Sequence, residues 1–174
     1  SKLEEIGLAL KRFGAEKTII AIGDNFTQSQ YFLAAHANEI MLNPLGGVMI
    51  TGFGSYRSYF KEALDNLKIT MNIFRAGQYK SAVEPLMGNT MSPQVRDETQ
   101  HLLGDLWQFY IAEVEDLRFL ETGTINEYAN NLHLTLADNG GDFAALAKEI
   151  GLIDVIATRS EIIGYLNDSI PGSE

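Results

Sequence analysis

The chain has no cysteine, and this absence excludes several kinds of chemistry. Without thiols there is no disulfide, no thiolate metal ligand and no cysteine nucleophile. Basic residues are also scarce: 13 Lys and Arg stand against 23 Asp and Glu, for a net charge of −10. Phosphate recognition depends on clustered Lys and Arg. We therefore expect no nucleic-acid partner.

Long apolar runs and common ligand motifs are missing too. No run of about 18 apolar residues occurs, so nothing in these 174 residues is expected to cross a bilayer. No GxGxxG follows a strand, and neither GxxxxGK[ST] nor HExxH is present. His101 and His133 have no partners at metal-ligand spacing, and His36 is expected to be a hydrogen-bonded core histidine. We expect no cofactor and no metal.

Enough apolar material remains for a folded core, since 45% of the residues are hydrophobic. Residues 18–22 (TIIAI) are typical of a buried parallel strand. After the turn at 23–25, Thr27 and Gln30 match a capping box that opens a helix. Strand, turn and capped helix together indicate one α/β unit.

The same pattern recurs along the chain. Further strands are predicted at 39–42, 47–51, 69–74 and 153–156, and helices at 3–13, 55–67, 93–120, 142–150 and 159–166. Alternation of this kind predicts an α/β fold with a mainly parallel sheet flanked by helices. We expect one domain over residues 1–166 and a loose tail over 167–174.

The helix that begins at Pro93, with Ser92 as its cap, is predicted to be the longest. Its expected buried stripe consists of Val95, Leu102, Leu106, Phe109, Tyr110 and Val114. Glu113, Glu115 and Asp116 are expected on its solvated face. Residues 138–142 (DNGGD) lack the spacing of a calcium loop and are expected to form a turn.

Three segments carry a specific resemblance: residues 23–44, residues 74–93 (FRAGQYKSAVEPLMGNTMSP) and residues 147–163. Together they are similar to the amino-terminal catalytic domain of signal peptide peptidases of the long, protease IV type. The resemblance implies a crotonase-like fold built from repeated ββα units. It also implies a homo-oligomeric serine peptidase that degrades cleaved signal peptides, anchored at the periplasmic face of the bacterial inner membrane.

The resemblance further implies a Ser–Lys dyad whose lysine, the general base, is Lys80 in the motif Tyr79-Lys80-Ser81. The serine position of shorter relatives falls on Gln28, which cannot be a nucleophile. Ser29 is a poor substitute, because one residue on a helix turns the side chain by about 100°. The serine is therefore expected in a second catalytic domain outside this chain. This chain also begins as if the first strands of its own domain were missing.

A lysine base must be neutral, so burial should lower its pKa and no carboxylate should face its amine. Glu84 follows four residues after Lys80, at a spacing that allows an ion pair on a helix. Pro85 is expected to keep Glu84 out of helical geometry and so away from the amine. Ser81 is a candidate for orienting the amine.

Two other functions remain open at this stage. A crotonase-type acyl-CoA enzyme would share the fold, but the sequence offers no paired Glu in a glycine-rich loop. A non-catalytic assembly domain would use surfaces such as the long helix to build an oligomer. Acyl-CoA binding and the mass in solution would distinguish these functions from a peptidase.

Overall fold

The structure is a computed structural model that describes residues 2–72 and 83–169. These residues form two compact units. Unit 1 combines Ser1–Gly52 with Phe109–Glu174, and unit 2 is Phe53–Gln108. Unit 2 is therefore inserted in the sequence between the two halves of unit 1, and each unit is described below by itself.

Unit 1 is built on a three-stranded parallel sheet in the order β1-β3-β5. Its strands are β1 (Ile20–Gly23), β3 (Glu39–Leu42) and β5 (Val155–Ile156). β1 pairs with β3 from Ile20↔Glu39 to Gly23↔Leu42, and β3 pairs with β5 at Met41↔Val155 and Leu42↔Ile156. Parallel strands are stable when both faces are covered, which explains the apolar run of the central strand.

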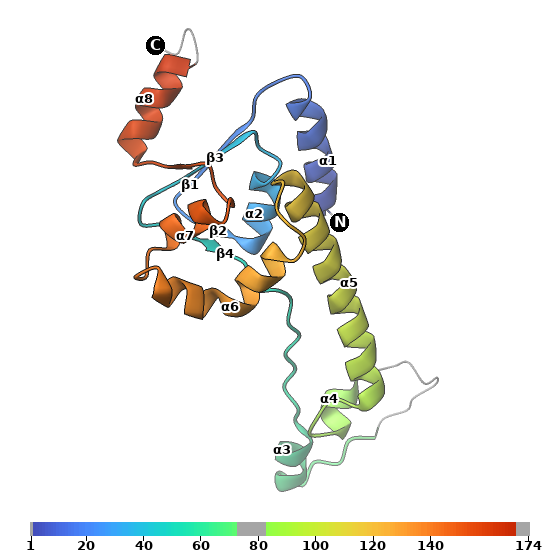
Figure 1. Cartoon of the computed structure of the whole chain (residues 1–174). Coiled ribbons are helices and arrows are strands. Elements are labelled where there is room, and N and C mark those ends of the chain that lie inside the picture. The colour runs from blue at the N-terminus through green and yellow to red at the C-terminus, as the bar shows by residue number, and fades with distance from the viewer. Residues whose placement is uncertain (1, 73–82, 170–174) are drawn as a thin grey trace. The chain divides into compact units, whose positions relative to one another are not determined.

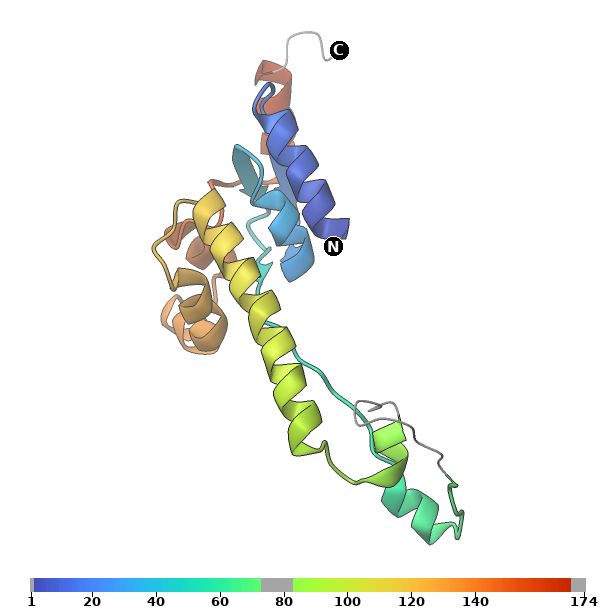
Figure 2. The ribbon, with the colours of Figure 1, turned by 90° about the vertical axis from the view of Figure 1, so that its right-hand side faces the viewer.

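Six helices supply residues to unit 1. They are α1 (Lys2–Gly14), α2 (Gln28–Ala34), the end of α5 (Pro93–Leu117), α6 (Thr124–Asp138), α7 (Phe143–Glu149) and α8 (Arg159–Ser169). α1 packs against α2, and α6 against α7 (Figure 1). The pairing of α1 with α2 is also clear in Figure 2, where the two helices lie side by side.

The core of unit 1 lies around β3, whose Ile40, Met41 and Leu42 are almost wholly buried. On α2, Tyr31 and Phe32 are buried, and the ring of Phe32 lies 5.9 Å from that of Tyr110 on α5. Burial of aromatic and aliphatic side chains of this size contributes about 1.5–3 kcal/mol each. These contacts hold the amino-terminal turn of α2 in place.

A second, shorter sheet pairs β2 (Phe26–Thr27) with β4 (Val48–Met49) in parallel. The predicted capping box is confirmed where β2 passes into α2, because Gln30 Oε1 accepts the Thr27 N–H at 2.9 Å. The same oxygen accepts the Thr27 hydroxyl. The first residue of α2, Gln28, therefore follows a fixed strand and a fixed cap.

Unit 2 contains α3 (Lys61–Asn66), α4 (Glu84–Met87) and the first part of α5. The Phe60 N–H donates to the Pro85 carbonyl at 2.7 Å, and the Glu62 N–H donates to Asn89 Oδ1 at 3.2 Å. Many of its large apolar side chains are exposed, including Tyr56 (97%), Leu67 (69%) and Leu102 (59%). Its fold thus rests on hydrogen bonds as much as on apolar packing.

The α/β class with parallel strands and flanking helices is confirmed, and it agrees with the crotonase-like fold. Two local expectations were wrong. Residues 69–72 form no strand, while 73 and 74 lie outside the described residues. The helix expected at 55–67 shortens to α3, because residues 55–60 contribute few buried contacts to support it.

At the other end of the chain, α8 runs to Ser169, and residues 170–174 lie outside the described range. None of the helices that the structure describes combines the length and apolar character needed to cross a membrane.

Candidate functional site

The predicted general base, Lys80, falls within residues 73–82, outside the part of the chain that the structure describes. Its neighbour Ser81 falls in the same range. The role of each stays a prediction. The described chain resumes at Val83, directly before α4.

Glu84 is the first residue of α4, so the expectation that Pro85 would keep it out of a helix is wrong. Proline fits in the first turn of a helix, where its missing N–H has no partner to lose. The Glu84 carboxylate accepts the Ser92 N–H on Oε1 at 2.8 Å. This bond ties α4 to the residue that caps α5, whose hydroxyl accepts the Val95 N–H at 3.4 Å.

Two polar atoms of unit 2 are buried without a hydrogen-bond partner among the described residues: Tyr59 Oη and Glu84 Oε2. An unsatisfied buried polar atom costs about 1–3 kcal/mol. Unit 2 therefore retains unused hydrogen-bonding capacity close in sequence to residues 73–82.

Gln28 lies at the start of α2 with its side chain half-buried. Its Oε1 accepts two backbone N–H groups, that of Thr51 at 3.1 Å and that of Gly52 at 2.8 Å. Its own carbonyl accepts the Tyr110 hydroxyl at 3.2 Å. Gln28 thus holds the segment directly after β4 through hydrogen bonds.

Ser29 is exposed, and no described residue is hydrogen-bonded to its side chain. A serine nucleophile needs a base within about 2.6–3.2 Å. His36, two turns along the chain, is 3% exposed; its Nδ1 lies 2.9 Å from the Phe32 carbonyl and its Nε2 lies 3.9 Å from Glu113 Oε1. The prediction of a hydrogen-bonded core histidine is confirmed, because the two ring nitrogens of His36 face the Phe32 carbonyl and the Glu113 carboxylate.

Three tyrosines of unit 1 use their hydroxyls to bind backbone carbonyls. Tyr31 donates to Leu152 and Tyr128 donates to Val48, each at 2.7 Å, while Tyr110 donates to Gln28. Burial raises the pKa of all three phenols above their ordinary value of 10.0. They therefore stay protonated near neutral pH and act as structural donors.

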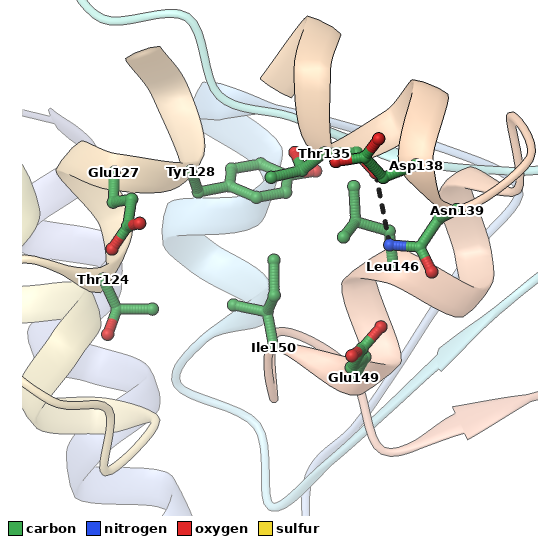
Figure 3. A pocket seen from close by; sticks show the side chains of 9 residues that line it. All are labelled: Thr124, Glu127, Tyr128, Thr135, Asp138, Asn139, Leu146, Glu149 and Ile150. Atoms are coloured by element: carbon green, nitrogen blue, oxygen red, sulfur yellow. Dashed lines mark hydrogen bonds between the residues drawn. The ribbon is translucent and has the colours of Figure 1, made fainter. Parts of the chain in front are cut away.

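A pocket of about 500 Å³ opens between α6 and α7 (Figure 3). Glu127, Asp138 and Glu149 give its lining an acidic character, and Asn139 Nδ2 donates to the Thr135 carbonyl at 3.2 Å. No lysine or histidine lines it. Its lining therefore lacks the lysine that a Ser–Lys dyad requires.

The acidic residues of α5 do not all face solvent. Glu115 is only 6% exposed, which corrects the expectation for that residue, and its Oε1 accepts the N–H groups of Gly123 and Ile125, both at 3.0 Å. The turn predicted at 138–142 is confirmed, because Gly140 and Gly141 have positive φ and Asp142 caps α7. No group of three or more metal-ligating side chains occurs in the described ranges.

Sequence patterns gave no signal for two of these residues. Gln28 and its partners are 23 and 24 residues apart, and Glu115 binds N–H groups 8 and 10 residues on. Both use a side-chain oxygen to satisfy backbone groups of another segment, and no periodicity records such a contact. The one hint for Glu115 was that Gly123, the N-cap residue of α6, has no side chain with which to cap the helix.

Parallel strands in the order β1-β3-β5 under flanking helices place the chain in the crotonase-like class of α/β proteins. The sequence matches the model of Peptidase family S49 over residues 11–168, and the chain belongs to that family. It is similar to Protease 4 of Haemophilus influenzae, with 40% identity over 161 residues, and to Protease 4 of Salmonella typhi, with 38% identity over 158 residues. These alignments cover 92% and 90% of the chain but 26% of each relative, so the chain spans about a quarter of the length of the curated relatives it matches.

Proposed function

We propose that this chain is the part of a bacterial serine peptidase that supplies the general base of a Ser–Lys dyad, Lys80. The observation that supports this most strongly is membership of Peptidase family S49 through a match that runs across residues 79–81. The serine would lie in another domain of the same polypeptide. This fits a chain that spans about a quarter of its relatives and has Gln28 in place of a nucleophile.

The chemistry of such a dyad sets clear demands on Lys80. The neutral amine takes the proton of the serine hydroxyl as the hydroxyl oxygen attacks the peptide carbonyl, and the ammonium then protonates the leaving amine. A water molecule hydrolyses the acyl-enzyme by the same route. Because the amine must be neutral at working pH, a nearby carboxylate would oppose catalysis.

The contacts of Glu84 are compatible with that demand. One of its oxygens accepts the Ser92 N–H, which directs the carboxylate toward the start of α5. Its other oxygen, Oε2, is buried without a hydrogen-bond partner among the described residues. The dyad proposal therefore requires that the Lys80 amine does not bind this oxygen, since an ion pair would raise the pKa of the amine.

The substrates proposed are cleaved signal peptides, and the full-length protein would act as a homo-oligomer at the periplasmic face of the bacterial inner membrane, with its anchor outside this chain. The exposed apolar side chains of unit 2 support an assembly role for this part of the peptidase. Mass measurement of the full-length protein, with Leu102→Ser as the variant, tests that role. Loss of the oligomer is expected, and an unchanged mass would contradict it.

Peptide turnover by full-length protein carrying Lys80→Ala tests the catalytic proposal. We expect a loss of at least about 10³-fold, because removal of a dyad base leaves only binding and oxyanion stabilisation. Lys68→Ala is the matched control, since it removes another lysine of unit 2 and should leave turnover unchanged. Near-normal turnover by a folded Lys80→Ala protein would refute the dyad, and saturable acyl-CoA binding would point to the alternative enzyme class.

A further inference from the structure

Residues 51–52, the 51–52 segment directly after β4, point two successive backbone N–H groups at one oxygen. The N–H groups of Thr51 and Gly52 lie 3.1 and 2.8 Å from Gln28 Oε1. Gly52 has φ +77°, in the left-handed region that glycine adopts without steric cost. Successive N–H groups next to a left-handed residue form a concavity that binds an anionic or carbonyl oxygen. The 51–52 segment is therefore an acceptor-binding position, and the Gln28 side chain fills it.

The group that fills this position is chemically a peptide group. A glutamine side chain carries a primary amide, whose carbonyl oxygen accepts hydrogen bonds in the same way as a backbone carbonyl. Gln28 places that amide where the oxygen of an extended peptide would be bound. It thus acts as an internal substitute for a peptide carbonyl.

The Gln28 side chain is free to leave without disturbing the helix that carries it. The Gln28 backbone carbonyl is bound by the Tyr110 hydroxyl, and the start of α2 is capped by Gln30. The side chain itself is only half-buried and ends in a flexible arm. Helix position and amide position are therefore held by separate contacts.

An incoming ligand has room beside the 51–52 segment. A Cβ added at Gly52 would meet nothing within 4 Å, and Thr51 is exposed. β4 pairs only with β2 among the strands that the structure describes, and its Met49 is 45% exposed. A peptide that approaches this edge reaches the two N–H groups from solvent once the amide moves away.

We propose that the 51–52 segment is a binding position for a backbone carbonyl oxygen of a peptide, and that the Gln28 amide fills it until a peptide displaces it. This inference rests on the proposed function, namely that the full-length protein acts on peptides. Gln28 is then a competitor of the substrate. Removing its amide should strengthen peptide binding, and giving it a charged oxygen should weaken peptide binding.

The test measures binding separately from turnover. Fluorescence anisotropy follows a dye-labelled, eight-residue apolar peptide on full-length protein in a Lys80→Ala background. Gln28→Ala should lower the Kd about fivefold, since each of the two bonds contributes a factor of roughly 2–12. Gln28→Glu keeps the size of the side chain and should raise the Kd about fivefold or more, because a carboxylate accepts stronger hydrogen bonds. Ser29→Ala, at the exposed neighbour, should leave the Kd unchanged.

Opposite shifts for the two Gln28 variants support the inference. If Gln28→Ala weakens peptide binding or leaves it unchanged, the amide only stabilises the 51–52 segment and the inference fails. If Gln28→Ala folds poorly, Gln28→Glu still tests the inference. A lower or unchanged Kd for Gln28→Glu contradicts the inference by itself. Turnover that survives Lys80→Ala would instead overturn the catalytic proposal and leave the Gln28 result standing.

Discussion

Glu115 on α5 binds the Ile125 N–H at 3.0 Å and so fixes the first turn of α6 from another helix. The same oxygen accepts the Gly123 N–H, and Gly123 is the N-cap residue that lacks a side chain of its own. A buried carboxylate therefore does the work that a Ser or Asp does at other helix starts. The two bonds thus join the start of α6 to α5 within unit 1.

Replacing Glu115 should destabilise the chain more than replacing its exposed neighbour. Glu115→Ala removes the acceptor of two backbone donors, the part-buried Gly123 N–H and the buried Ile125 N–H, so we expect a loss of about 2–4 kcal/mol in the free energy of unfolding. Glu115→Gln keeps one carbonyl oxygen and should lose less than half as much. Urea unfolding measures all three, with Asp116→Ala as a control within about 0.5 kcal/mol. Equal losses for Glu115 and Asp116 variants would contradict the capping role.

Among the described residues, the ion pairs Arg118–Asp154 and Lys61–Asp65 should contribute differently to the free energy of unfolding. Arg118, whose side chain is 9% exposed, lies 2.7 Å from Asp154 Oδ1 and also donates to the Gly151 carbonyl. Arg118→Met should cost about 1–3 kcal/mol, discounted because Asp154 is 37% exposed. Lys61–Asp65 is the control pair, since both side chains are exposed, and Lys61→Met should cost under about 0.5 kcal/mol. Urea unfolding of each variant decides, and similar costs would refute the distinction.

Stability should fall at alkaline pH because of the buried phenols. Burial raises the folded-state pKa of Tyr31, Tyr110 and Tyr128 above the unfolded value of about 10. Below pH 10 both states keep these protons, so nothing changes. Above pH 10 the unfolded state releases them first, and each tyrosine lowers the free energy of unfolding by up to about 1.4 kcal/mol per pH unit.

Urea unfolding between pH 9 and pH 11.5 checks this slope. Tyr128→Phe removes one phenol and its bond to Val48, so it should lower stability at pH 8 and flatten the alkaline slope by about a third. Tyr56→Phe, at a residue that is 97% exposed, should change neither quantity. A slope that is unaffected by Tyr128→Phe would show that other groups cause the alkaline loss.

Two helical glycines should respond to alanine with opposite signs. A Cβ at Gly7 on α1 would lie 2.8 Å from His36 Nε2, and the His36 ring is buried and cannot easily move. Gly7→Ala should therefore destabilise by about 1–3 kcal/mol despite its better helix propensity. A Cβ at Gly104 on α5 meets nothing within 4 Å, so Gly104→Ala should stabilise by roughly 0.5–1 kcal/mol. Thermal unfolding of both variants is sufficient, and equal signs would contradict the prediction.

The parts of the fold that the sequence predicted are those with a local signal. β1 and β3 follow short apolar runs, and the start of α5 follows Ser92-Pro93. Periodicity identified an apolar face on α5 but not its partner: Tyr110 and Val114 are buried, whereas Leu102, Leu106 and Phe109 are 44–59% exposed. α6 was not predicted at all, because its start is capped by Glu115 through a contact between helices.

The candidate site divides in the same way. The catalytic hypothesis comes from the family resemblance of the motif around Lys80. The structure adds the hydrogen bond from the Ser92 N–H to Glu84 and the exposed position of Ser29. The bonds of Gln28 to Thr51 and Gly52 had no signal in the sequence, because they depend on where the segment after β4 lies in the fold.

The strand order has a consequence for synthesis of the chain. β3 is ready once residue 42 has been made, but β5, which pairs with its second edge, comes more than 110 residues later. These residues include all 56 of unit 2 (53–108), and their synthesis takes roughly 6–23 s at 5–20 residues per second. During that delay Ile40, Met41 and Leu42 are an unprotected, aggregation-prone edge. A nascent chain halted before residue 155 should therefore need a holding chaperone, and release of that chaperone should coincide with the arrival of β5.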